Sequence, residues 1–377
     1  MQVSVWEKES FYAHSDVLII GSGFVGLWSA YFLLCEDPSL RITIVDRGVI
    51  PAGASTRNAG FACFGSLTEL AHDVSAMGEE QMLQLVEMRF KGLKRIRKLL
   101  PKKAFDYSTC GGYELITHKA GETPASLSEK ITWLNELLET VTGRKKTFRS
   151  DDSKIKEFGF RKVDHVVENR LEGYLHSGKL CQVLLQLVQG LGVTVLPVTE
   201  VLSYEKQRDT FVAATNHGIS LTADQLLVCT NAFARQLLPA LDVQPARGQV
   251  LVTSPIEGLR FKGTFHFDEG FYYFRNLGNR VLLGGARNKA FQEETSYEFK
   301  TTDLIQQELE RYLGECILPQ SNYSIEHRWS GIMGMGAEKM PIVQELAPGI
   351  FCAVRMSGMG VALAPVVGEK ISKLMRG

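Results

Sequence analysis

A chain of 377 residues is too long for one ordinary domain, and its 45% hydrophobic and 22% charged residues are typical of a globular protein of two domains. Lys plus Arg and Asp plus Glu both number 42, so the zero net charge gives no electrostatic reason to expect nucleic acid or an anionic membrane surface as a partner. The seven cysteines are scattered without a C-x-x-C pair, which disfavours a disulfide framework or a zinc site and predicts a reducing, cytoplasmic location.

We expect neither a signal peptide nor a membrane span at the start of the chain. Its first ten residues, MQVSVWEKES, lack the basic stretch followed by an apolar core that marks a signal peptide. Residues 17–35 carry no charge and are long enough to span a bilayer, but Gly21, Gly23 and Gly26 interrupt them. A buried strand, a glycine turn and a buried helix explain this stretch better, so we expect no membrane span.

A βαβ unit opens the chain. Residues 16–20 predict a short buried strand, residues 27–34 an apolar helix, and residues 41–45 a second strand that ends at Asp46. Between the first strand and the helix lies the G-x-G-x-x-G pattern of a Rossmann-type dinucleotide site, formed by Gly21, Ser22, Gly23, Phe24, Val25 and Gly26. Its glycines permit a tight turn, a close approach of the backbone to a pyrophosphate, and close packing of helix on strand.

Asp46 favours an unphosphorylated ribose. Its carboxylate can accept hydrogen bonds from a ribose diol, whereas Arg47 beside it could meet a 2′-phosphate. This pattern alone does not separate NAD from FAD.

The segment after the second strand favours FAD. Residues 53–61 read G-A-S-T-R-N-A-G-F, which resembles the "G-A-S-x-R-N-x-G" segment of the FAD-dependent amino-acid oxidoreductase family, the family of D-amino-acid oxidase, glycine oxidase, sarcosine oxidase and γ-glutamylputrescine oxidase. The resemblance implies that this loop lies along the pyrophosphate and ribityl chain and ends close to the isoalloxazine. The cofactor contacts it implies here are Ser55, Thr56, Arg57, Asn58, Ala59, Gly60 and Phe61.

The resemblance continues along nearly the whole chain. An amphipathic helix is expected from 175 to 190, followed by a strand whose backbone near Val201 contacts the adenine, and by a strand at 224–232. Residues 271–275 and 279–285 predict a hairpin whose "Y-F-R … L-L-x-G-G" pattern is closest to the γ-glutamylputrescine oxidase-like branch. The family's two flavin-flanking segments correspond to residues 328–331 and 355–361. The contacts implied there are Gly331, Arg355, Ser357, Gly358, Met359, Gly360 and Val361.

Three departures from the family pattern bear on chemistry. Ser330 occupies the position of the cysteine that attaches flavin in sarcosine oxidases, which predicts noncovalent FAD. Leu282 occupies the position of the lysine that those oxidases use with dioxygen. Ala362 lies near the position of a lysine that binds the substrate carboxylate. The acceptor could therefore be dioxygen or a quinone- or dye-type carrier.

The expected fold is α/β, or α+β overall, with a Rossmann-type FAD-binding domain and an inserted antiparallel-sheet substrate domain. We assign residues 1–90, 165–240 and 325–377 to the first, and residues 91–164 and 241–324 to the second. The basic stretch 91–103 is interrupted by leucine and isoleucine and predicts a helix with one solvated cationic face, in preference to a nucleic-acid patch.

The predicted activity is oxidation of the C–N bond of a small amine or amino acid, with hydride transfer to flavin N5. On a strand Tyr273 and Arg275 share a face opposite Tyr272, so we expect Tyr273 to flank the amine and Arg275 to pair with a carboxylate. Arg355 is the rival anchor. The alternatives are a flavoprotein with structural FAD or a macromolecular substrate such as RNA, and an NAD-dependent dehydrogenase. No metal-ligand spacing is present among the eight histidines, so no metal is expected.

Overall fold

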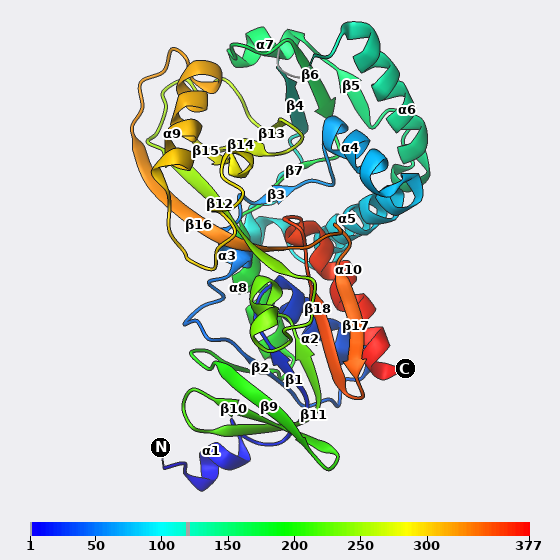
Figure 1. The fold of residues 1–377 in the computed structure, drawn as a ribbon, viewed down its shortest axis with the longest axis vertical. Helices are drawn as coiled ribbons and strands as arrows, with labels where there is room; N and C mark the ends of the chain where they lie inside the picture. Colours follow the sequence, from blue (N-terminus) through cyan, green and yellow to red (C-terminus); the bar gives the residue numbers. More distant parts are fainter. Residues whose placement is uncertain (1, 118–120) are drawn as a thin grey trace.

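The structure is a computed structural model that describes residues 2–117 and 121–377. It has two halves, each built around a sheet of eight strands (Figure 1). Both termini lie in the lower half of the view. The chain crosses between the halves repeatedly, so each sheet combines strands from distant parts of the sequence.

The first sheet is the Rossmann-type half. Its order is β17 (Ile342–Ala347), β18 (Ile350–Val354), β11 (Ser220–Val228), β1 (Ser15–Ile20), β2 (Ile42–Val45) and β8 (Thr194–Leu196), and β10 (Thr210–Thr215) and β9 (Val201–Gln207) extend from β11. β1 pairs in parallel with both β2 and β11, and all four residues of β2 are buried. Helices α2 (Phe24–Glu36), α8 (Ser177–Gly190) and α10 (Gly360–Arg376) belong to this half. α10 packs so closely on α2 that a methyl group on Gly368 would lie 2.8 Å from the Trp28 backbone.

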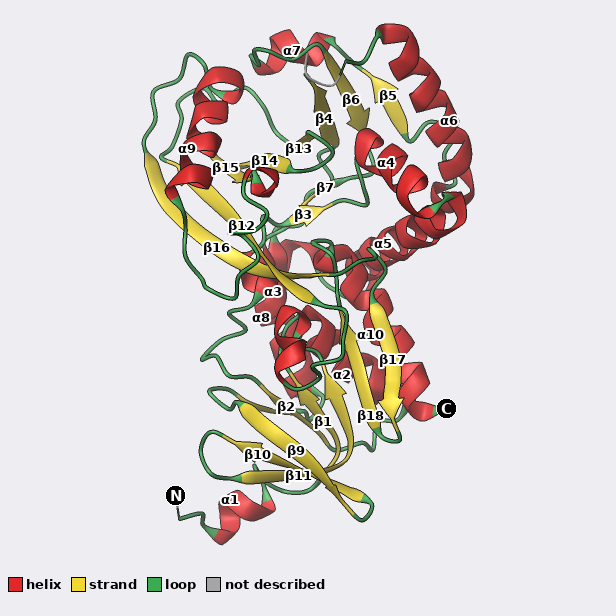
Figure 2. Ribbon diagram, in the orientation of Figure 1, coloured by secondary structure: helices red, strands yellow, loops and turns green. Residues whose placement is uncertain are grey.

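The second sheet is more strongly curved and forms the upper half (Figure 2). Its order is β16 (Ile325–Met335), β12 (Gln244–Thr253), β15 (Arg280–Gly285), β14 (Tyr272–Leu277), β13 (Thr264–Phe267), β4 (Gly112–Ile116), β6 (His165–Asn169) and β5 (Phe148–Ser150). All its pairs are antiparallel except β13 with β4. The phenylalanine-rich core that includes Phe265 and Phe274, whose rings stack at 4.5 Å, lies on one of its faces.

The remaining elements connect or cover the two sheets. β3 (Phe61–Ala62) pairs with β7 (Gly173–Tyr174) in a small sheet of their own. The other helices are α1 (Val5–Glu9), α3 (Ala54–Arg57), α4 (Leu67–Met77), α5 (Glu79–Leu99), α6 (Pro124–Thr142), α7 (Ser153–Phe158) and α9 (Asp303–Tyr312), with short turns η1 (Lys102–Phe105), η3 (Asn231–Gln236), η4 (Arg287–Lys289) and η5 (Leu313–Ile317).

The expected mixed α/β fold with two sheets is confirmed, as are the opening βαβ unit and the hairpin of β14 and β15. Two predicted domain boundaries, at residues 165 and 325, fall differently: β6 and β16 pair within the second sheet. The reason is that β16 runs antiparallel to β12 along its whole length, a pairing that local sequence does not reveal. We therefore propose that these two strands belong to the substrate-binding domain. In the described ranges, no helix is both long and apolar enough to cross a bilayer.

Candidate cofactor and substrate site

A cavity of about 790 Å³ is lined by residues from both halves of the molecule. The first half contributes the β1–α2 turn, the segment after β2, the turn η3 and the beginning of α10. The second half contributes β16, the β13–β14 turn and the end of β15. Its size is within the range of ligand and cofactor sites.

The β1–α2 turn has the geometry that the glycine pattern predicts. Gly21 adopts a φ of +108°, a conformation that favours glycine. A methyl group on Gly26 would lie 2.0 Å from the carbonyl oxygen of Gly21, so only glycine lets α2 pack this closely on the strand. Gly23 caps the helix without a side chain, which leaves the positive end of the α2 dipole facing the cavity. This end of the cavity suits a pyrophosphate.

Asp46 is held at the end of β2 by three hydrogen bonds. The backbone N–H and the hydroxyl of Ser22 donate to its Oδ2 at 2.9 and 2.7 Å, and the N–H of Gly48 donates to its Oδ1 at 2.9 Å. The carboxylate also lines the cavity. It is therefore oriented before any ribose hydroxyl reaches it.

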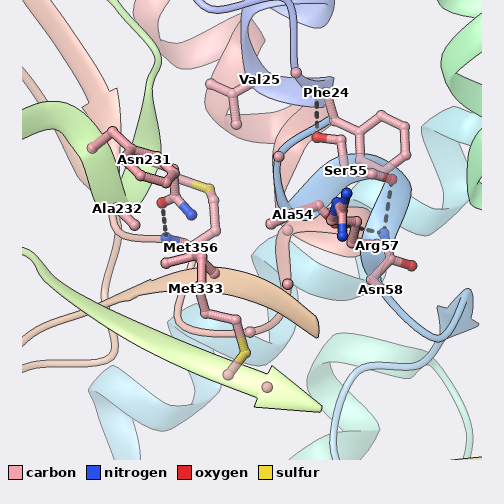
Figure 3. Close-up of a pocket in the computed structure, with 18 of the residues that line it drawn as sticks. Phe24, Val25, Ala54, Ser55, Arg57, Asn58, Asn231, Ala232, Met333 and Met356 are labelled. Atoms are coloured by element: carbon pink, nitrogen blue, oxygen red, sulfur yellow. Dashed lines mark hydrogen bonds between the residues drawn. The ribbon is translucent and has the colours of Figure 1, made fainter. Parts of the chain in front are cut away.

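The loop that begins with α3 is tied to the α2 N-terminus (Figure 3). The Phe24 N–H donates to the Ser55 hydroxyl at 2.9 Å. Asn58 donates to the Ser55 carbonyl at 2.9 Å and accepts from the Gly60 N–H at 2.8 Å. Arg57 donates to the Ser330 carbonyl of β16 at 3.1 Å, which ties the loop to the second sheet. The loop is thus a rigid wall shared by both halves.

The segment before α10 forms the opposite wall. Asn231 of η3 accepts hydrogen bonds from the N–H groups of Arg355 and Met356 at 3.0 and 3.3 Å (Figure 3 shows Asn231 beside Met356). Arg355 and Ser357 both have positive φ, at 63° and 46°, which turns the chain sharply into α10. The first residues of α10 therefore line the cavity.

Polar groups without partners support a bound polar ligand in this cavity. Thr230 and Ser357 both line it, and within the described residues their buried hydroxyls have no hydrogen-bond partner. A buried hydroxyl without a partner is unfavourable, and a bound polar molecule would satisfy it. Together with the glycine turn and Asp46, these residues fit FAD.

Most of the expected cofactor contacts line the cavity. They are Gly21, Gly23, Phe24, Val25, Asp46, Arg47, Ser55, Arg57, Asn58, Ala59, Phe61, Val201, Gly331, Ser357, Gly358, Met359, Gly360 and Val361. The cavity lining does not include four of the expected contacts, Ser22, Gly26, Thr56 and Gly60. These residues position others that do line the cavity; Thr56, for example, donates a hydrogen bond to the Pro51 carbonyl at 2.7 Å. Contact of each with the cofactor stays a prediction.

Arg355 does not line the cavity. Its side chain is 8% exposed, and its Nη1 lies 2.6 Å from Oδ2 of Asp242 and its Nη2 3.4 Å from Glu338. Its Nε donates to the Met340 carbonyl at 2.8 Å. A guanidinium with these partners braces the turn before α10 and is not brought into the cavity.

Tyr273 and Arg275 share a face of β14, as expected, but only Tyr273 lines the cavity. Arg275 packs behind the cofactor loop, where a methyl group on Gly60 would lie 3.3 Å from its Nη2. Its Cζ lies 4.6 Å from the centre of the Tyr174 ring. Burial lowers the pKa of Arg275 to about 10. Tyr272 points the other way and donates to Glu308 at 2.8 Å.

The position of the Tyr273 ring requires a glycine beside it. A methyl group on Gly284, its partner across β15, would lie 2.6 Å from the ring. On the other side Tyr273 pairs with His266 of β13, which also lines the cavity. Burial raises the pKa of Tyr273 to about 12 and lowers that of His266 to about 4, so both are neutral at physiological pH. In the described structure the Nε2 atom of His266 is buried without a hydrogen-bond partner.

Sequence reasoning missed three charged residues at this end of the cavity. Arg287 follows β15 and lines the cavity, with the Phe291 ring 4.7 Å from its Cζ. Among the described residues its guanidinium has no hydrogen bond or ion pair, although the negative charge of Glu294, which is paired with Arg247, acts on it from farther away. Burial lowers the pKa of Arg287. Glu69 and Lys339 also line the cavity, 3.6 Å apart. Burial has the largest single effect on the pKa of Glu69 and raises it, but the nearby positive charges and a hydrogen bond from Arg89 together lower the pKa overall. The G-G-A-R sequence after the predicted hairpin was the available signal for Arg287.

Comparison with known proteins agrees with this geometry. The chain is 25% identical to a probable oxidoreductase OrdL of Rhizobium meliloti over 96% of its own length and 83% of the relative's. Among solved structures it is similar to L-proline dehydrogenase from P. horikoshii, with a TM-score of 0.77 and 16% identity over 96% of this chain and 93% of the other. It is also similar to glycine oxidase from Geobacillus kaustophilus, with a TM-score of 0.76 and 17% identity over 96% and 95%.

A model of the family described as DAO, FAD dependent oxidoreductase, matches residues 16–374. This match excludes the alternative of an NAD-dependent dehydrogenase, whereas the γ-glutamylputrescine oxidase-like branch stays a prediction. Noncovalent binding, inferred from Ser330, also stays a prediction. The chain therefore belongs to this family of FAD-dependent oxidoreductases.

Proposed function

We propose that this protein oxidises the C–N bond of a small amine or amino acid that carries a carboxylate. FAD supplies the acceptor, flavin N5, for the hydride equivalent that leaves the carbon bearing the nitrogen. The nitrogen lone pair forms the C=N bond as the hydride leaves, and water hydrolyses the resulting iminium ion to a carbonyl compound and an amine, with release of a proton to solvent. Residues of the chain need only bind the substrate, orient it and keep it in the neutral amine form.

The observation that carries this proposal is the unpaired Arg287 at the substrate end of the cavity. A half-buried guanidinium without an anionic partner is costly, and a substrate carboxylate would satisfy it with two parallel hydrogen bonds. Tyr273 and His266 lie on the adjacent strands and are uncharged. They can make hydrogen bonds to the amine without repelling or protonating it.

The proposed electron acceptor rests on Leu282. This residue is 3% exposed and packs with Ala59, Val250 and Val252 in a small apolar cluster. An apolar side chain at this position offers no charge to stabilise superoxide. We therefore propose a quinone- or dye-type acceptor in preference to dioxygen, in a cytoplasmic protein that has no nucleic-acid partner.

Anaerobic bleaching of the bound flavin tests the activity. The panel contains D-amino acids, N-methyl amino acids and polyamine derivatives, each paired with its analogue lacking the carboxylate. We expect bleaching by carboxylate-bearing members. If dithionite bleaches the flavin and no member of the panel does, C–N oxidation is refuted.

Arg287→Gln tests the anchor. Loss of a charge-assisted pair worth about 1.5–3 kcal/mol should raise the apparent substrate constant on the order of 10- to 100-fold, with a smaller effect on flavin reduction at saturation. Lys289→Gln is the matched control, because Lys289 lies in the same turn, is exposed and is not among the residues that line the cavity. Equal effects of the two substitutions would remove Arg287 from the substrate site.

A further inference from the structure

The segment between η4 and α9 crosses from the second sheet toward the Rossmann-type half (Figure 1, the loop that leads into α9). Residues 295–301 of this segment have no regular secondary structure, and we call them the strap. With the exception of Ser296, they are exposed. The strap is therefore a surface segment that bridges the two halves. Its ends are held by buried polar contacts, whereas its middle makes exposed aromatic contacts.

Both ends of the strap are fixed to β12 by one buried polar network. Before the strap, Glu294 pairs with Arg247 through two hydrogen bonds of 2.8 Å, and both side chains are 1% exposed. After it, the Thr302 N–H donates to Oε1 of Gln249 at 2.9 Å. Gln249 also donates to Glu294 at 2.9 Å, which joins the two anchors. A network of this kind is costly to break, so the ends stay in place.

The middle of the strap contacts the other half through the exposed aromatic rings of Tyr297 and Phe299. The Tyr297 ring is tilted against that of Phe233 of η3, with centres 5.2 Å apart, and the Phe299 ring lies nearly parallel to it at 6.3 Å. The guanidinium of Arg47 lies 3.8 Å from the centre of the Phe233 ring, and that of Arg57 lies 4.6 Å from the centre of the Phe299 ring. Tyr297 is 37% and Phe299 42% exposed.

These contacts lie over the cofactor cavity. Phe233, Phe299, Arg47 and Arg57 all line it, and Arg47 directly follows Asp46, the expected ribose ligand. The arginines therefore link the strap to the wall that faces the nucleotide half of the cofactor. Exposed aromatic and cation–π contacts contribute little individually, so the strap can lift while its anchors hold.

We propose that the strap is a latch over the noncovalent FAD and sets the rates at which the cofactor enters and leaves. Phe299 and Phe233 form the latch, and the network around Glu294 is its hinge. The inference rests on FAD as the cofactor and is independent of the substrate.

Stopped-flow flavin fluorescence tests the latch. Holoenzyme is mixed with an excess of a nonfluorescent FAD analogue, and the release of FAD is followed. We expect Phe299→Ala to accelerate release on the order of tenfold, the value of one aromatic and one cation–π contact. FAD binding to the apoprotein should accelerate as well, because the same latch opens for both directions.

The control is Phe291→Ala. Phe291 lies in the same connection, is 45% exposed and lines the cavity, but its ring packs on Phe271 and Arg287 of its own half. It should leave the release rate unchanged. Phe233→Ala and the Phe233→Ala/Phe299→Ala double variant should both match Phe299→Ala, because either change opens one shared latch.

Three results would overturn the proposal. Release from Phe299→Ala could equal that from Phe291→Ala, the two latch substitutions could add, or release could accelerate without faster binding. The last two results would mean that each ring contacts FAD directly. Because the assay uses no substrate, its failure leaves the proposed C–N oxidation untouched, and failure of that activity leaves the latch intact.

Discussion

Glu172 gives the sharpest prediction about stability. It is 2% exposed, and its Oε1 accepts hydrogen bonds from the N–H groups of Phe64 and Gly65 at 2.9 and 3.4 Å. Burial raises its pKa from 4.5 to about 8, and these two hydrogen bonds offset only part of the increase. At neutral pH the Glu172 carboxyl group is therefore protonated, and in that form it accepts the hydrogen bonds that hold the turn after β3.

The sign of the pH effect follows from proton binding. Between pH 4.5 and 8 the folded state keeps a proton on Glu172 that the unfolded state releases, so the free energy of unfolding falls as pH rises and levels off above pH 8. The loss is about 1.4 kcal/mol per pH unit, or roughly 3 kcal/mol by pH 7. Glu172→Gln does not titrate and keeps an acceptor oxygen for both N–H groups, so it should remove this loss.

The assay is the urea midpoint of the holoenzyme in a constant excess of FAD, since a bound ligand alters apparent stability. From pH 5 to pH 8 the wild-type midpoint should fall more steeply than that of Glu172→Gln, and at pH 7.5 the variant should be the more stable. Glu257→Gln, at an exposed position, should follow the wild type. Parallel profiles of wild type and Glu172→Gln would refute the reasoning, because they would mean that folding leaves the proton affinity of Glu172 unchanged.

Further predictions concern the cofactor, a structural arginine and oxygen. Gly26→Ala places a methyl group 2.0 Å from the Gly21 carbonyl oxygen and should yield colourless apoprotein, whereas Gly190→Ala, with nothing within 4 Å, should keep its absorbance at 450 nm. Arg355→Ala removes ion pairs with two solvent-exposed carboxylates and a hydrogen bond to the Met340 carbonyl, and should lower unfolding stability by about 1–2 kcal/mol with an unchanged apparent substrate constant; a raised constant would return it to the substrate site. Because Leu282 provides no charge, the reduced enzyme should react faster with a quinone than with dioxygen in stopped-flow reoxidation, and rapid reoxidation in air with stoichiometric peroxide would contradict this.

The sequence by itself determined the cofactor half of the protein. The positions of Gly21, Gly26 and Asp46 depend on a strand, a turn and a helix that follow one another directly, so periodicity and glycine spacing were sufficient to predict them. The place of the loop around Ser55 was implied by the family resemblance instead, and its contact with Phe24 lies at the beginning of α2. Local order along the chain translates directly into local geometry.

Only the tertiary structure decided the substrate end. Sequence alternation correctly placed Tyr273 and Arg275 on one face of β14, but it could not show that the Gly60 loop covers Arg275 or that Asp242 pairs with Arg355. Only the tertiary structure also showed that β6 and β16 belong to the second sheet and that Arg287 lines the cavity. These features depend on which strands pair and on how two halves assembled from distant segments meet, and residues far apart in sequence carry no local signal of that meeting.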